Sequence, residues 1–290
     1  MPSFTIAIPD SILRDASDLR AKTVKVGELA RAAAVHRVTE LIIYRDPAEK
    51  VPSSEKTLLL TLLRYIETPQ YLRKVLFPMQ KELRFAGLLP PLATPHHPTT
   101  SQLAHFRDYE IREGVIIKKL EYHAHIDVGA EVPIRLLDAE RLHLGERVTV
   151  IVDKETQTAR LMTRADVTEY WGFLIVSLGN SLGTYLNQLP PQPGELRIAT
   201  SRTGTSIIDL RSTLIPCLSR ATKILVAFGS PKRGLPEMLT QEGIKLSDVF
   251  DFCLNMLPWG QGTRTVRVKE AIHISLSILW SILAQEEDVP

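Results

Sequence analysis

Apolar strand-like runs alternate with helical segments at both ends of the chain, and this alternation restricts the fold more than any other feature. Residues 4–8 alternate as a short strand that stops at a proline. A capped helix is expected over residues 18–36, followed by a β-branched strand over residues 38–44 and a second helix from residue 53. Strand–helix–strand–helix order predicts parallel strands with helices on the faces of the sheet.

The same rhythm returns after Trp171. Four apolar runs predict strands: GFLIVS, ELRIAT ending at Thr200, KILVAF before Gly229, and Val249–Leu254. A short helix is expected over residues 181–189. A long C-terminal helix is indicated by one apolar stripe, which consists of Ile272, Leu276, Leu279 and Leu283.

The segment between these two parts differs in composition and in hydrophobic pattern. Gly87–Pro98, GLLPPLATPHHP, is rich in proline and predicts a stiff linker without helix. Its adjacent His96 and His97 lack a second pair at ligand spacing, so we interpret them as linker residues and predict no metal site. Residues 106–162 hold short alternating runs broken by glycines, which is typical of a small β-barrel. We therefore expect a barrel domain, residues 89–163, inserted into an α/β domain made of residues 1–88 and 164–290.

A small barrel inside an α/β chain is typical of a binding module, by analogy with oligonucleotide-binding barrels. Its His123 and His125 alternate on one strand face, where ordinary sheet positions explain them more simply than metal ligation. Just before the linker, residues 68–84 carry basic side chains among aromatic and aliphatic ones. That stretch predicts either an RNA-holding surface or a solvated amphipathic helix broken at Pro78. Its basic residues are Arg73, Lys74, Lys81 and Arg84.

Composition restricts the class of protein but not its partner. The formal net charge is +2, so a nucleic-acid partner is neither demanded nor excluded. Cys217 and Cys253 are too few for a disulfide framework or a zinc site, which makes a reducing cytoplasm the expected location. No apolar run reaches the length of a membrane span and no secretory signal precedes the first strand, so no membrane partner is expected.

Three loops follow predicted strands in the C-terminal part: TSRTGT at residues 200–205, FGSPKRG at residues 228–234, and NMLPWGQGTRT at residues 255–265. Each combines glycine, hydroxyl groups and arginine, and ligands of parallel sheets bind outside the carboxyl ends of the strands. Neither a GxxxxGK[ST] nor a GxGxxG sequence follows a strand, and no Ser–His–Asp or Cys–His arrangement stands out. The loops therefore favour a ligand site that is not a nucleotide-triphosphate, dinucleotide or hydrolase site.

Several segments resemble one family. They are FGSP, PWGQGTRTVR and TSRTGT, with IPDSI near the N-terminus and the LFP, GLLPPL and HHP sequences farther on. The chain resembles an RNA methyltransferase family of the SPOUT (α/β-knot) superfamily, archaeal and eukaryotic members of which carry an inserted barrel. The resemblance covers nearly the whole chain. It implies a deep trefoil knot in a mainly parallel sheet with helices on both faces, an OB-like inserted barrel, and a homodimer that completes a site for S-adenosyl-L-methionine.

The resemblance also implies roles for the three loops. Phe228, Gly229 and Ser230 would line the ribose and methionine side of the cofactor, and residues 255–257 and 260–265 would wrap the adenine. Ser201 and Gly204 would close the methionine end. The full set of cofactor residues is Thr200, Ser201, Gly204, Phe228, Gly229, Ser230, Asn255, Met256, Leu257, Pro258, Gly260, Gly262, Thr263, Arg264 and Thr265.

The remaining residues of these loops have open roles. Arg202 and Arg264 are the candidate catalytic residues, because a guanidinium stays protonated and binds planar groups, although phosphate or dimer-interface contact explains them equally well. Lys232 and Arg233 are expected to hold substrate phosphate. Trp259 would either flank the adenine or pack on the sheet edge, and packing is favoured.

The resulting hypothesis is an S-adenosylmethionine-dependent methyltransferase of ribosomal or transfer RNA, which releases S-adenosylhomocysteine. The barrel and a basic surface would grip the RNA. A protein methyltransferase and a non-catalytic RNA-binding or assembly factor on the same fold are the alternatives. The target RNA, nucleotide and atom are left open by the sequence.

Overall fold

The computed structural model describes residues 2–287, with side chains to residue 285. It contains two units: one comprises residues 1–63, 85–90 and 173–290, and the other comprises residues 64–84 and 91–172. We call them the sheet unit and the barrel unit. Within residues 2–287, no helix combines the length and the apolar character that crossing a bilayer requires.

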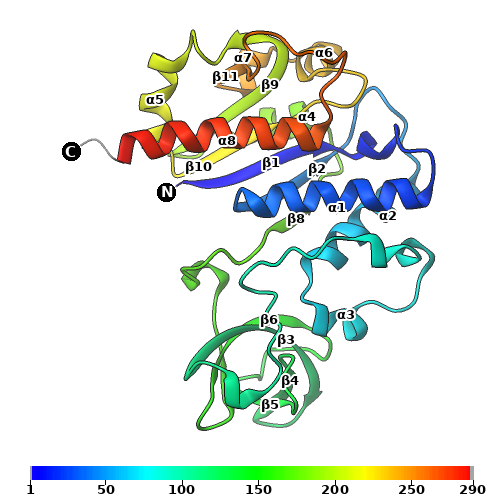
Figure 1. Cartoon of the computed structure of the whole chain (residues 1–290), viewed down its shortest axis with the longest axis vertical. Coiled ribbons are helices and arrows are strands. Elements are labelled where there is room, and N and C mark those ends of the chain that lie inside the picture. Colours follow the sequence, from blue (N-terminus) through cyan, green and yellow to red (C-terminus); the bar gives the residue numbers. More distant parts are fainter. Residues whose placement is uncertain (1, 288–290) are drawn as a thin grey trace. The chain divides into compact units, whose positions relative to one another are not determined.

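The sheet unit is built on six parallel strands in the order β11-β9-β10-β1-β2-β8 (Figure 1). The predicted α/β class with a parallel sheet is confirmed. The strands are β1 (Ser3–Pro9), β2 (Val38–Tyr44), β8 (Leu174–Ser177), β9 (Glu195–Ser206), β10 (Lys223–Ala227) and β11 (Phe252–Asn255). The helices are α1 (Leu19–Val35), α2 (Ser53–Glu67), α4 (Leu182–Gln188), α5 (Arg211–Arg220), α6 (Leu235–Gln241), α7 (Leu246–Val249) and α8 (Val268–Glu287), with 3-10 turns η1 (Asp10–Leu13) and η3 (Ala86–Leu88).

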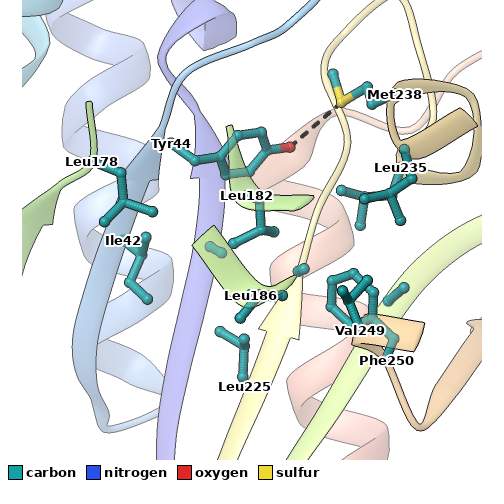
Figure 2. Close-up of a cluster of buried hydrophobic side chains, with 14 residues drawn as sticks. Ile42, Tyr44, Leu178, Leu182, Leu186, Leu225, Leu235, Met238, Val249 and Phe250 are labelled. Carbon is teal, nitrogen blue, oxygen red and sulfur yellow. Dashed lines mark hydrogen bonds between the residues drawn. The ribbon is translucent and has the colours of Figure 1, made fainter. Parts of the chain in front are cut away.

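Helices cover both faces of this sheet. On one face α1 and α8 lie side by side (Figure 1), and Trp280 of α8 stacks on Phe4 of β1 with ring centroids 5.9 Å apart. All four residues of the predicted C-terminal stripe are buried. On the other face α4, α6 and α7 bury a cluster that includes Leu182, Leu186, Leu235, Met238 and Val249 (Figure 2). Burial of this apolar surface on both faces holds the strands in a fixed register.

The barrel unit contains a closed five-stranded barrel in the order β3-β4-β5-β7-β6, as the sequence predicts. Its strands are β3 (Tyr109–Lys119), β4 (His123–Asp127), β5 (Ile134–Leu137), β6 (Arg147–Asp153) and β7 (Thr158–Leu161). Strand side chains alternate, so Ala124, Ile126, Ile134, Leu136, Val150, Val152 and Ala159 fill the interior. The unit also holds α3 (Gln70–Leu76) and 3-10 turns η2 (Lys81–Leu83), η4 (Leu103–His105) and η5 (Arg164–Asp166).

Two predicted strand boundaries are wrong. Val249 belongs to helix α7 and β11 begins only at Phe252, because a short apolar run does not distinguish a buried helix end from a strand. The strand that was expected to stop at Thr200 continues to Ser206, because its pairing with β11 resumes after the loop. Parts of the proline-rich linker are packed: Leu92 and His96 are 2% and 0% exposed.

Candidate functional site

The three polar loops leave adjacent parallel strands. Strand β9 pairs with β10 on one side and with β11 on the other, and all run in the same direction. Their carboxyl ends therefore deliver residues 200–204, 228–234 and 255–265 to one edge of the sheet. We call these segments the β9 loop, the β10 loop and the β11 loop.

The β9 loop is an excursion within a strand. Cys253 pairs with Ala199, and the next residue, Leu254, pairs with Thr205, so five residues of β9 are skipped in one step of β11. Gly204 closes this excursion, because a Cβ there would lie 2.7 Å from the carbonyl oxygen of Cys253. Glycine is the residue that permits so close a backbone approach.

The β10 loop is anchored from β2. The buried hydroxyl of Tyr44 donates to the carbonyl oxygen of Phe228 at 2.6 Å, and it lies 3.7 Å from the sulfur of Met238 (Figure 2). Burial, followed by the charges of Asp46, Asp10 and Glu242, raises the pKa of Tyr44 well above its usual value, so this donor stays protonated. A Cβ on Gly229 would lie 2.7 Å from the carbonyl of Arg233, which shows how tightly this loop turns.

A second link joins the β10 loop to the segment after β2. Lys232 forms an ion pair with Glu49 at 2.8 Å, and the hydrogen bond from Lys232 lowers the pKa of the Glu49 carboxyl. Both side chains are accessible to solvent, so this pair contributes little stability by itself. It does place a carboxylate beside a lysine that was expected to hold phosphate.

The β11 loop has an apolar base and an open outer part. Met256 is buried and Leu257 is half-buried, whereas Gly260, Gly262, Thr263, Arg264 and Thr265 are exposed. The loop is held by its own polar groups: the Gln261 amide donates to the carbonyls of Thr263 and Arg264, at 2.9 and 3.0 Å. No atom lies within 4 Å of an added Cβ at Gly262, so the loop leaves free space there.

Asn255 connects the β11 loop to the β9 loop. Its side-chain amide donates to the carbonyl of Arg202 at 3.2 Å, and its side-chain oxygen accepts from the backbone N–H of Leu257 at 2.9 Å. The β9 loop also reaches the end of β10, since the Thr200 hydroxyl donates to the Ala227 carbonyl at 2.8 Å. The three loops thus form one connected assembly.

A buried acidic cluster lies where β1 and β2 end, at the same edge of the sheet. Asp10 accepts from the backbone N–H of Asp46 at 3.0 Å, and the hydroxyl of Ser11 donates to the Asp46 carboxylate at 2.5 Å. Burial raises the pKa of Asp10, and the backbone hydrogen bond from Asp46 partly opposes the effect. Asp10 and Ser11 belong to the IPDSI segment, which sequence reasoning marked only as part of a resemblance.

Comparison with known sequences identifies the family. The sequence profile of the family described as "Putative RNA methyltransferase" matches residues 3–279. The chain belongs to this family of RNA methyltransferases. It is 30% identical to a 28S rRNA (uridine-N(3))-methyltransferase of Homo sapiens, over 98% of this chain and 79% of the human protein.

Two further relatives differ in how much of their length is matched. A 28S rRNA (uridine-N(3))-methyltransferase of Drosophila melanogaster is 31% identical over 96% of this chain, and the chain spans 61% of that protein. An uncharacterized protein of Haloarcula marismortui is 33% identical over 95% of this chain and 98% of its own length.

The structure of this family member brings together all the residues that the resemblance assigned to the cofactor, at the carboxyl edge of β9, β10 and β11. They differ in accessibility: Phe228 is buried at 2% exposure, whereas Ser201 and Ser230 are half-buried. The guanidinium groups of Arg202 and Arg264 are exposed and make no ion pair with any residue in the described part of the chain. The preferred packing of Trp259 on the sheet edge is wrong, because the side chain is 92% exposed.

Sequence reasoning missed the buried polar residues at this edge of the sheet, of which Tyr44 holds the β10 loop. Tyr44, Asp10 and Asp46 stand at the ends of β1 and β2 and are nearly inaccessible to solvent. The signal was present, because polar residues directly after buried strands mark the ligand-binding edge of a parallel sheet.

The basic residues of the 68–84 segment lie in the barrel unit and have separate surroundings. Arg73 donates to the backbone carbonyls of Thr68 and Ile66, at 2.9 and 3.1 Å, and lies over the ring of Tyr65. Lys74, Lys81 and Arg84 are exposed. Helix α3 ends before Pro78, which confirms the predicted break.

His96 and His97 take part in a buried ionic cluster of the barrel unit. Glu67 accepts from Arg147 at 2.7 Å and Arg164 at 3.0 Å, and Glu113 accepts from Arg147 at 2.7 Å and from the indole N–H of Trp171 at 2.6 Å. Burial alone would raise the pKa of Glu67, but the hydrogen bond from His96 and the charges of both arginines lower it to about 2. Within residues 2–287 no group of three or more His, Cys, Asp or Glu side chains is arranged to hold a metal ion.

Proposed function

We propose that this chain transfers a methyl group from S-adenosyl-L-methionine to RNA, and that the target atom is N3 of a uridine in ribosomal RNA. The observation that carries the proposal is the convergence of the β9, β10 and β11 loops at one sheet edge, in a chain that the RNA methyltransferase family covers from residue 3 to 279. The uridine N3 target is taken from the names of the human and fly relatives.

The residues of the three loops fit such a cofactor. The base of the β11 loop is apolar at Met256 and Leu257, and its outer part offers glycines and hydroxyls without filling the space around Gly262. An adenine needs a slot of this kind with backbone donors and acceptors. When bound, S-adenosylmethionine supplies a methyl group on a positively charged sulfur, and S-adenosylhomocysteine is left after transfer.

The nucleophile must lose a proton and be held in line with the methyl carbon. Uracil N3 would give its proton to water, and its electron pair would then accept the methyl group that a bound cofactor supplies. The negative charge that gathers on the uracil oxygens is balanced in our proposal by Arg202 and Arg264, whose exposed guanidinium groups have no competing carboxylate in the described chain. Lys232 and Arg233 then hold a neighbouring phosphate.

We place the sheet unit in the SPOUT superfamily, with the C-terminal segment threaded as a trefoil knot around these loops. The parallel order β11-β9-β10 and the resemblance of the three loops support this placement. We likewise assign the barrel to the OB type, since its five strands close in the order β3-β4-β5-β7-β6. The two cysteines, which are free thiols, agree with action in the cytoplasm.

We propose that a second copy of the chain completes the enzyme. An open groove of about 310 Å³ between residues 207–211 and helix α8 supports the proposal, because half of the residues that line it are isoleucines, namely Ile207, Ile208, Ile278 and Ile282. Ile208 is 55% exposed, and an exposed isoleucine in an apolar groove is typical of an interface. Sedimentation of the wild type and of Ile208→Glu tests this: a dimer should dissociate in the variant, and a wild-type monomer would refute the proposal.

The function is tested by titrating S-adenosylhomocysteine into the wild type and Gly262→Trp, and by transfer of a labelled methyl group to ribosomal RNA. We expect micromolar binding that Gly262→Trp abolishes, and methyl label on uridine N3 after nuclease digestion. Cofactor binding with label on protein and none on RNA would indicate a protein methyltransferase. A folded wild type that binds RNA but no cofactor would indicate an assembly factor.

A further inference from the structure

The outer face of the barrel carries a set of cationic side chains that adjacent strands hold in register. Lys118 of β3 pairs with His125 of β4, and His125 pairs with Arg135 of β5. The next strand, β7, places Thr158 beside Arg135, and Arg160 lies two residues farther along the same face. Together with His123, these residues form what we call the barrel cationic face, which consists of the cations Lys118, Arg135 and Arg160 and the imidazoles of His123 and His125.

The salt bridges of the described chain leave this face unpaired, although the Asp153 carboxylate lies near it: a hydrogen bond from the backbone of Thr156 and, in smaller part, the charge of Arg160 lower the pKa of Asp153. None of the five residues forms an ion pair with a carboxylate in residues 2–287, in contrast to Arg112, Arg147 and Arg164 of the same unit. Burial lowers the pKa of His123, and repulsion from the nearby charges of Arg135 and His125 lowers it further, so His123 is uncharged at neutral pH. Such repulsion is relieved when a polyanion binds.

Acidic side chains border the face: Asp153 of β6 pairs with Thr158 of β7, and Asp127 follows His125 on the same face of β4. The Asp127 carboxylate, at one end of β4, accepts from the backbone N–H of Gly129 at 2.9 Å. Glu121 and Asp138 are exposed in the turns that follow β3 and β5. The acids therefore border the face, with Asp153 on the side of Arg160, and they leave Lys118, His125 and Arg135 as a continuous line across three strands.

An exposed aromatic residue stands beside this line. Tyr122, in the turn between β3 and β4, is 73% exposed and directly precedes His123. Single-stranded nucleic acids bind where cations follow the backbone and aromatic rings stack on bases. Strands are about 4.8 Å apart, so Lys118 and Arg135, with one strand between them, are about 10 Å apart and fit a chain of phosphates that crosses the strands.

We propose that the barrel cationic face binds a single-stranded segment of the substrate RNA, with the phosphates along Lys118, His125 and Arg135 and a base stacked on Tyr122. This inference rests on the proposed function and specifies it. It assigns the main RNA contact to the barrel strands instead of the segment that contains Arg73, whose guanidinium is already hydrogen-bonded to two backbone carbonyls.

The test measures binding of a labelled single-stranded uridine 15-mer to the full chain by fluorescence anisotropy over a series of salt concentrations. The face variant is Lys118→Gln/Arg135→Gln/Arg160→Gln. Its matched control is Arg20→Gln/Arg220→Gln/Lys245→Gln, which removes the same charge from exposed positions of the sheet unit. Thermal melting and S-adenosylhomocysteine titration establish that each variant is folded and retains its cofactor site.

We expect the face variant to bind RNA at least about tenfold more weakly and its salt slope to fall by about 2, because each lost contact to a single strand contributes roughly 0.7. Tyr122→Ala should weaken binding about tenfold with an unchanged salt slope, since stacking does not release counterions. The control should bind like the wild type. Crosslinking of a 4-thiouridine RNA to the wild type should modify the peptide that contains Tyr122 and His123.

Three results would overturn the inference. RNA binding that is equal in the face variant and the control, without a crosslink at Tyr122, would refute the barrel cationic face and leave the proposed function standing. A wild type that binds cofactor but no RNA would refute both. A polyglutamate of equal charge that binds the wild type as tightly as the RNA would identify an acidic protein segment as the occupant.

Discussion

The side-chain amide of Asn255 donates to the backbone carbonyl of Arg202 at 3.2 Å, and this bond ties the β11 loop to the β9 loop. The same side chain accepts from Leu257 at 2.9 Å, so one asparagine fixes both the start of its own loop and the position of its neighbour. The backbone that carries Arg202 is therefore positioned by a residue of a different strand.

Replacing Asn255 with alanine should weaken cofactor binding more than it weakens the fold. Two hydrogen bonds of about 1 kcal/mol each are lost at a half-exposed site, where water replaces part of them. We expect S-adenosylhomocysteine to bind about tenfold more weakly by calorimetry, with the melting temperature lowered by only a few degrees. Asn187→Ala, at an exposed position of α4, is the control, and equal cofactor affinities in the two variants would contradict the role of Asn255.

Gly204→Ala should disrupt the β9 loop through the backbone. The new methyl group would lie 2.7 Å from the carbonyl oxygen of Cys253, so the pairing of β9 with β11 must shift. We expect a loss of about 1–3 kcal/mol in the free energy of unfolding, together with loss of cofactor binding. Gly262→Ala meets no atom within 4 Å and should leave the urea midpoint unchanged. Similar midpoints for both variants would show that the excursion tolerates a side chain.

Tyr44→Phe should loosen the β10 loop from behind. The variant leaves the carbonyl of Phe228 buried without its donor, which costs about 1–3 kcal/mol. Urea denaturation should show this loss, whereas Tyr109→Phe, at a residue that is 66% exposed, should be neutral. Equal stabilities would mean that water reaches the Phe228 carbonyl.

Acid should weaken the ionic cluster of the barrel unit over a defined range. The pKa of Glu67 is lowered from 4.5 to about 2, so its contribution to stability is complete above pH 4.5 and is lost as the pH falls toward 2. Burial and the charge of His96 lower the pKa of His97 from 6.5 to about 4, and its protonation adds a loss of stability between pH 6.5 and 4. Trp171, whose indole donates to Glu113, should report the transition by fluorescence.

Glu67→Gln should reduce this dependence and destabilise the unit at pH 7 by about 3–5 kcal/mol, because Arg147 and Arg164 lose a buried partner. Glu169→Gln breaks only the exposed pair with Arg107 and should have little effect. If Glu67→Gln and the wild type have the same denaturation midpoint at neutral pH, the guanidinium groups of Arg147 and Arg164 must be hydrated in the variant.

Sequence patterns predicted the parts of the fold in which hydrophobic residues recur with a clear helical or strand periodicity. The helix that begins after Asp18, the strand at Val38–Tyr44 and the closed barrel all follow from alternation and capping, and Asp18 does accept from the backbone N–H of Ala21. Helices α5 and α6 were not predicted, because each contains an internal or early proline that obscures its periodicity.

The sequence predicted the three loops of the candidate site, but it did not predict the hydrogen bonds that hold these loops. The hydrogen bonds of Tyr44 and Asn255 join residues 184 and 53 positions apart in the sequence, and pairing at that separation depends on the register of the sheet. The predicted packing of Trp259 was wrong for another reason, since its side chain is exposed. Apolar character favours burial on average but does not determine the orientation of a loop residue.

The excursion in β9 has a kinetic consequence for ligand entry. Because the ladder closes on both sides of residues 200–204, the conformational entropy of this loop is lost when the chain folds and not when a ligand arrives. A preorganised loop does not need to fold when the ligand binds, so association should be a single-step encounter. Differences in affinity between variants should then appear mainly in the dissociation rate. The five residues that interrupt the strand would then set how long a cofactor stays, more than how quickly it enters.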